Sequence, residues 1–134
     1  MQYWFKPIIA TYFYGGLRKH EAAYNRELKY SGLKGENLIY EKGKLSYIYL
    51  PPTKGRKERQ IPVIKDLREN LEEYLKSRGK VGEKDFVFIY QGGSSKGDPV
   101  RGDRVYIEFK RYAKLAGIPT TQRLDGMRHL PFLD

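Results

Sequence analysis

The chain has 134 residues and carries 26 lysine and arginine residues against 16 acidic ones, a formal net charge of +10. Apolar residues make up 40% of it, which is typical of one globular domain rather than a disordered chain, and no apolar run approaches the ~20 residues that span a bilayer. The absence of cysteine excludes disulfides and thiolate chemistry, so we expect a soluble cytoplasmic protein without a membrane partner, whose positive field attracts nucleic acid.

The first predicted element is a buried helix between Tyr3 and Tyr14. Its aromatic and aliphatic residues recur at helical spacing, and Pro7 is compatible with a first helical turn. The positions expected to face the core are Phe5, Ile8, Ile9, Tyr12 and Phe13.

A glycine pair, Gly15 and Gly16, ends this first helix, and residues 17–23 are predicted to form a second, short helix. Arg18 and Glu21 stand three residues apart, which would place both side chains on one helix face. An arginine directly after a tight turn is fixed in direction and can present its guanidinium to a phosphate.

The hydrophobic period then changes to two, which predicts short strands at 38–40, 45–50 and 59–63. Gly43 lies in the first turn, at a position suited to positive φ. The second connection, residues 53–58, is a loop rich in cations. These segments are expected to form a small antiparallel sheet.

Two amphipathic helices are predicted over residues 64–76 and 103–116, with Gly79 as a C-cap of the first. The buried stripes expected are Ile64, Leu67, Leu71, Tyr74 and Leu75 on the first, and Val105, Phe109, Tyr112 and Ala116 on the second. The fold class predicted is therefore α+β, a mostly helical domain with a small antiparallel three-stranded sheet, and residues 1–134 are expected to form one domain.

Three basic motifs follow one another along the chain, each in a different setting. Arg18 follows the glycine turn, Lys54 lies in the cationic loop, and Arg128 lies in a C-terminal box. Taken alone, each is more often a solvated surface residue than part of a site. The two histidines, His20 and His129, do not pair with a second ligand at metal spacing, so no metal site is expected.

With these motifs in this order, the sequence resembles the catalytic domain of the tyrosine recombinases, the phage integrase family. The matching pieces are Gly16-Leu17-Arg18 followed by Glu21, the Lys54-Gly55 turn followed by Lys57-Glu58-Arg59 and Ile61-Pro62-Val63, and Met127-Arg128-His129. The resemblance extends over nearly the whole chain, about residues 5–129.

The resemblance implies DNA strand exchange. Arg18 and Arg128 match the pair of arginines that bind the scissile phosphate, and Lys54 matches the lysine that protonates the departing 5′-oxygen. Glu21 matches an acidic residue that orients the site, and His129 is a further candidate for a chemical role. The cationic side chains neutralise the charge themselves, so no metal or cofactor is expected.

The partner implied is double-stranded DNA, with other recombinase protomers as a further candidate. The residues expected to contact DNA share a positive charge and the motifs above. They are Arg18, Lys19, Lys54, Arg56, Lys57, Arg59 and Arg128.

The sequence departs from the family pattern in two places. Asp125 stands where the family usually has a histidine, and a carboxylate there is expected to weaken phosphate binding by repulsion. The family's nucleophile is a tyrosine on a later helix, whereas the last tyrosine here is Tyr112. The chain thus resembles a C-terminally truncated catalytic domain and is expected to be inactive alone.

Two alternatives stay open at this point. One is a non-catalytic DNA-binding remnant that regulates a full-length recombinase. The other is a basic RNA-binding or ribosome-associated protein with accidental matches, although the aromatic strands and glycine clamps of common RNA modules are not evident. Convergence of Arg18, Lys54 and Arg128 on one point would favour the recombinase interpretation.

Overall fold

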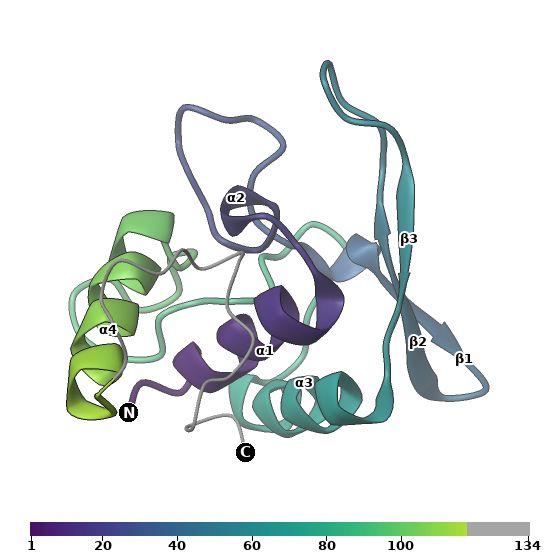
Figure 1. The fold of residues 1–134 in the computed structure, drawn as a ribbon. Coiled ribbons are helices and arrows are strands. Elements are labelled where there is room, and N and C mark those ends of the chain that lie inside the picture. Colours follow the sequence, from purple (N-terminus) through teal and green to yellow (C-terminus); the bar gives the residue numbers. More distant parts are fainter. Residues whose placement is uncertain (118–134) are drawn as a thin grey trace.

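The computed structural model describes residues 1–117, which form four α-helices, a 3₁₀ helix and a three-stranded antiparallel sheet (Figure 1). The helices are α1 (Phe5–Gly15), α2 (Lys19–Ala22), η1 (Gly35–Asn37), α3 (Lys65–Arg78) and α4 (Gly102–Leu115). The strands are β1 (Leu38–Glu41), β2 (Lys44–Leu50) and β3 (Arg59–Pro62), in the order β1-β2-β3. This arrangement confirms the predicted α+β class.

Helix α1 occupies the centre of the fold, with α4 on one side and the sheet on the other (Figure 1). Phe5, Ile8 and Ile9 are fully buried in it, as their helical spacing predicts. The core continues into α3 through Leu67 and Leu71, which are also fully buried. Because α1 is enclosed in this way, the turn that follows it is held in a fixed position, and that turn leads into the candidate site.

The sheet is built from two hairpins of different length. A two-residue turn joins β1 to β2, where Lys42 and Gly43 both have positive φ, 52° and 79°, as a tight hairpin turn requires. Strands β2 and β3 pair from Tyr47 with Pro62 to Leu50 with Arg59. Residues 51–58 then extend beyond the paired strands as a long hairpin loop (Figure 1).

Two of the predicted core positions are wrong, and both lie at helix ends. Ile64 is 48% exposed because it is the N-cap of α3, with an extended backbone outside the helix. Ala116 is exposed because α4 ends at Leu115, and Ala113 is buried instead. The predicted cap of α3 is confirmed, since Gly79 has φ 96° and its N–H donates to the carbonyl of Leu75.

The described helices also bear on membrane insertion. Within residues 1–117, none is both long and apolar enough to cross a bilayer.

Candidate nucleic-acid interface

The turn between α1 and α2 sets the position of Arg18. Gly16 has φ 67°, in the left-handed region, and its N–H donates to the carbonyl of Tyr12 as α1 ends. Helix α2 begins only at Lys19, so Arg18 is its N-cap with an extended backbone. The prediction that Arg18 and Glu21 share a helix face is therefore wrong. They meet instead through the backbone, where the Arg18 N–H donates to Oε1 of Glu21 at 2.7 Å.

Glu21 is a buried carboxylate, 3% exposed, at the centre of an ion-pair cluster. Nη1 of Arg56 donates to its Oε2 at 3.0 Å, and Nη1 of Arg59 lies 2.9 Å from both carboxylate oxygens. Arg59 also donates from Nη2 to the carbonyl of Gly16. One negative charge thus faces two positive charges, and the cluster retains a net positive charge while fastening the hairpin loop to α2.

Lys54 lies at the tip of the hairpin loop. The loop closes on itself there, because the N–H of Thr53 donates to the carbonyl of Arg56 and the N–H of Arg56 donates to the carbonyl of Thr53. Gly55, with φ 152°, completes the turn. Lys54 is exposed at this tip.

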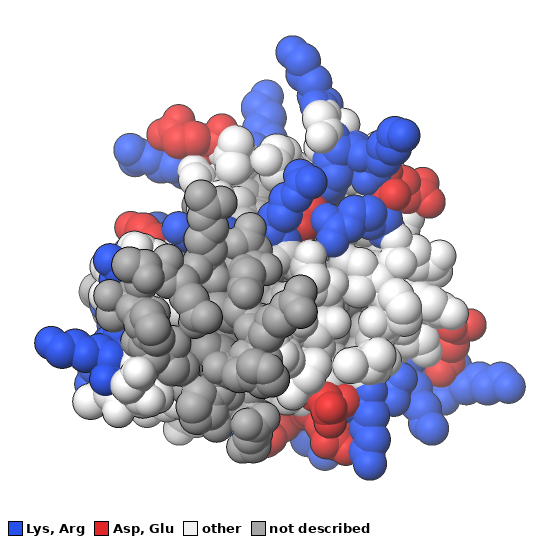
Figure 2. Space-filling view, in the orientation of Figure 1, with Lys and Arg blue, Asp and Glu red and all other residues white. Residues whose placement is uncertain are grey.

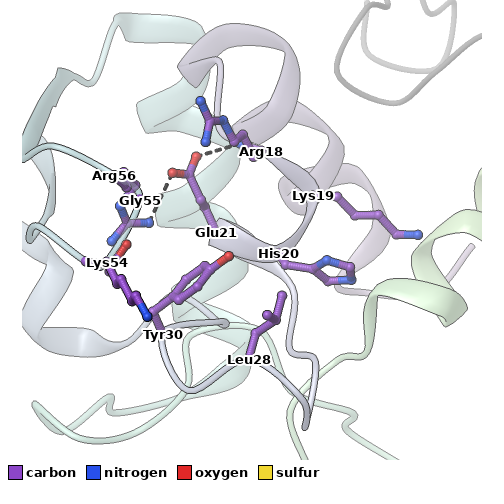
Figure 3. A pocket seen from close by; sticks show the side chains of 10 residues that line it. Arg18, Lys19, His20, Glu21, Leu28, Tyr30, Lys54, Gly55 and Arg56 are labelled. Atoms are coloured by element: carbon purple, nitrogen blue, oxygen red, sulfur yellow. Dashed lines mark hydrogen bonds and ion pairs between the residues drawn. The ribbon is translucent and has the colours of Figure 1, made fainter.

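Arg18 and Lys54 line the same hollow, of about 460 Å³, between α2 and the hairpin loop (Figure 3). Leu28 and Tyr30 provide an apolar wall. Neither Arg18 nor Lys54 has a side-chain ion pair in the part of the chain that the structure describes. Both cations therefore line one hollow, although in Figure 3 the Arg18 guanidinium lies beyond Glu21 and the Lys54 side chain runs toward Tyr30. Each is available to an anion such as a phosphate.

The Lys19 side chain extends in a different direction from that of its neighbour Arg18. Figure 3 shows its side chain directed away from Glu21, toward α4. There its Nζ lies 5.2 Å from the ring centroid of Tyr106. Lys19 and His20 form the boundary between the first hollow and a second one of about 640 Å³.

The second hollow contains a histidine with a perturbed pKa. Burial lowers the pKa of His20, the positive charge of Lys19 lowers it further, and Asp103 opposes both. Nδ2 of Asn25 lies 3.5 Å from Nε2 of the imidazole, and the ring packs against Gly102 at the start of α4. A side chain at position 102 would clash with this ring, so the glycine permits the close contact between α2 and α4.

Sequence reasoning missed the cations of this second hollow, Arg26 and Arg101. They are distant in the chain and belong to no motif. A parallel bridge between Tyr24 and Arg101 brings the two segments together, and such a pairing leaves no local signature in the sequence.

The predicted DNA contacts are only partly gathered on one side. Basic side chains cluster in Figure 2 where α2 and the hairpin loop lie in Figure 1. Lys57 is exposed there, as Arg18 and Lys54 are, whereas Arg56 and Arg59 are directed at Glu21. Three further predicted residues, Asp125, Arg128 and His129, lie outside the described residues.

The structure defines a basic α+β domain with a hollow lined by cationic side chains. Comparison with known families identifies the family of this domain: residues 4–130 match the Phage integrase family. The chain belongs to this family of tyrosine recombinases, which serve site-specific DNA recombination and integration and bind DNA. No curated protein and no solved structure matches the chain.

Proposed function

We propose that this chain is a DNA-binding catalytic-domain segment of a site-specific tyrosine recombinase. The observation that supports this most directly is that Arg18 and Lys54, distant in sequence, line one hollow and have no ion pair among the described residues. The ligand of that hollow is a backbone phosphate of double-stranded DNA.

Each cation has a separate role at the phosphate. The guanidinium of Arg18 offers two parallel N–H donors to the non-bridging oxygens, a geometry that an ammonium cannot reproduce. When the family's tyrosine nucleophile bonds to phosphorus and the bond from phosphorus to the 5′-oxygen breaks, Lys54 donates a proton to that oxygen, which an arginine cannot do because it does not deprotonate. Arg128 supplies the second guanidinium, and Asp125 and His129 stand beside it in the sequence.

Glu21 makes these roles compatible. Its charge is taken up by Arg56 and Arg59, so it does not compete with the phosphate for Arg18. Its remaining contact is with the backbone of Arg18, which sets the direction in which that residue leaves the turn. We assign Glu21 an orienting role, with Lys19, Lys57 and the partly exposed Arg59 adding to the positive field toward DNA.

A second candidate function is a non-catalytic DNA-binding regulator of a full-length recombinase. It requires only the hollow that Arg18 and Lys54 line, and no nucleophile. Both candidates require DNA binding at the same hollow and differ in whether a covalent intermediate forms.

The experiment is a fluorescence-anisotropy titration of one short labelled duplex at low salt. Arg18→Gln and Lys54→Gln are each expected to weaken binding about ten-fold, because each removes one charge-assisted contact to a phosphate. The matched control is Lys76→Gln, which removes an exposed cation on α3, away from the hairpin loop. If all three variants bind as tightly as the wild-type chain, the hollow is not the DNA site.

A further inference from the structure

The hairpin loop and the start of β3 carry four cations that the sequence groups as DNA contacts. The structure divides them into two kinds. Lys54 and Lys57 are exposed and have no ion pair in the described part of the chain. Arg56 and Arg59 both bind Glu21. The four charges therefore cannot all serve the phosphate in the same way.

Arg56 is the most buried of the four. Its side chain is 8% exposed, and its Nη1 donates to Glu21. Nη2 donates to the carbonyl of Pro51 at 2.7 Å, and the guanidinium carbon lies 5.4 Å from the ring centroid of Tyr30. Little of this guanidinium is open to a phosphate, since only 8% of the side chain is exposed, and its Nε is buried without a hydrogen-bond partner among the described residues.

The contacts of Arg56 fix the turn that carries Lys54. The backbone of Arg56 exchanges both of its hydrogen bonds with Thr53, so the side chain and the turn are held by the same residue. Glu21, which Arg56 contacts, also accepts a hydrogen bond from the backbone N–H of Arg18. A continuous series of bonds thus joins Arg18, through Glu21 and Arg56, to the turn that presents Lys54 (Figure 3).

We infer that Arg56 is a positioning residue, which holds Lys54 beside Arg18, and is not a phosphate ligand. We call its contacts with Glu21, the Pro51 carbonyl and Tyr30 the loop latch. Without the loop latch, the free energy of ordering the turn would subtract from the binding free energy that Lys54 contributes. The role of Lys54 rests on the proposed function, whereas the loop latch itself can be tested without DNA.

The first test is hydrogen exchange on the free protein. Arg56→Lys keeps the charge but cannot bind Glu21 and the Pro51 carbonyl together while stacking a planar group on Tyr30. We expect the amides of Thr53, Gly55 and Arg56, which are hydrogen-bonded within the turn, to exchange about ten-fold faster in this variant. Lys57→Gln is the matched control and should leave their exchange unchanged.

A second variant separates loss of the loop latch from a general loss of stability. Tyr30→Leu keeps an apolar wall but removes the ring face under Arg56, and Tyr30 is half exposed, so the core is not disturbed. It should accelerate the same amides, with α1 and α3 exchanging at the wild-type rate. If neither Tyr30→Leu nor Arg56→Lys changes exchange in the turn, Arg56 does not hold it.

The second test asks whether Arg56 acts through Lys54. In the wild-type background, Arg56→Lys should weaken duplex binding about five-fold. In a Lys54→Gln background the same substitution should weaken binding less than about two-fold, because the effects of coupled residues are not additive. The slope of affinity against salt should stay unchanged. A direct phosphate ligand gives the reverse: Arg56→Lys binds nearly as tightly as wild type, which overturns the inference. If the wild-type chain binds no duplex, the proposed function fails, while the exchange measurement still decides the loop latch.

Discussion

At the residue scale, Glu21 holds neighbouring cationic residues of this basic surface in defined positions. A single buried carboxylate accepts hydrogen bonds from the backbone of Arg18 and from the guanidinium groups of Arg56 and Arg59. The local motif predicts that Glu21 lies near Arg18. It does not predict the contacts with Arg56 of the hairpin loop and Arg59 of β3, because an ion pair between distant segments has no spacing that a sequence reveals.

Neutralising Glu21 is therefore expected to destabilise the fold. Glu21→Gln leaves two arginines, one of them almost fully buried, without their counter-ion, and breaking a buried ion pair costs about 3 kcal/mol in the free energy of unfolding. Urea denaturation measures this change. Glu27→Gln is the control, since Glu27 is exposed and, within residues 1–117, forms an ion pair only with its neighbour Arg26. Its loss should change stability by less than about 0.5 kcal/mol. Equal effects of the two substitutions would contradict the role assigned to Glu21.

Asp125 leads to a prediction from the sequence alone. It stands three residues before Arg128, where the family usually has a histidine, and its negative charge would repel a bound phosphate. We expect Asp125→Asn to tighten duplex binding at low salt by about five-fold, with Asp125→His similar, because the loss of charge is the main effect. Anisotropy titration of the three proteins tests this. Unchanged or weaker binding by both variants, with the fold intact, would show that Asp125 does not face the phosphate.

At the scale of elements, the contact between α2 and α4 includes a histidine, His20, whose pKa is lowered by burial and by Lys19. His20 packs against Gly102, with Asn25 beside its Nε2 and the charges of Lys19 and Asp103 acting on it. Its pKa in the folded protein lies below the value of about 6.5 expected when unfolded. The unfolded chain therefore binds the proton more readily, and acid favours unfolding.

The pH dependence of stability follows from this sign. The contribution of His20 is fully present above a pH of about 6.5 and is lost as the pH falls toward the lowered pKa. Melting temperatures measured at neutral and mildly acidic pH should fall more for the wild type than for His20→Gln. The comparison removes the contribution of carboxylates common to both proteins. A parallel fall in the two proteins would contradict a titrating His20 at this contact.

The elements also show what a sequence can predict. Helices α1, α3 and α4 and the three strands lie where the hydrophobic period predicts them. A buried face imposes that period on α3 and α4, whereas β1 buries only Leu38 and no residue of β3 is buried. The ends of the helices are less predictable from the sequence. Ile64 and Ala116 continue the apolar pattern but lie just outside α3 and α4. Helix α2 was placed two residues too early, since Arg18 caps it rather than joins it.

At the scale of the whole molecule, function depends on segments that the fold brings together. Sequence motifs identified Arg18 and Lys54 through resemblance to a family, and the fold places both at one hollow. The resemblance could not distinguish a committed arginine such as Arg56 from a free lysine such as Lys57. That difference is set by a buried carboxylate from another element and so requires the three-dimensional structure.

The order of residues along the chain predicts its behaviour on a nicked suicide duplex. No tyrosine follows Arg128, where the family has its nucleophile, and the last one, Tyr112, packs its ring 4.8 Å from that of Phe5. We expect this 134-residue chain to form no covalent DNA adduct on a denaturing gel. A covalent band that disappears in Tyr112→Phe would contradict this expectation and identify a different nucleophile.

The central claim is that Arg18 and Lys54 together bind DNA phosphate, and the salt dependence of duplex affinity tests it most directly. Each phosphate contact adds about 0.9 to the slope of log affinity against log salt concentration. The Arg18→Gln/Lys54→Gln double variant should therefore have a slope shallower than wild type by about 1.8, while Lys76→Gln keeps the wild-type slope. Parallel lines for the double variant and the wild type would show that neither residue binds a phosphate.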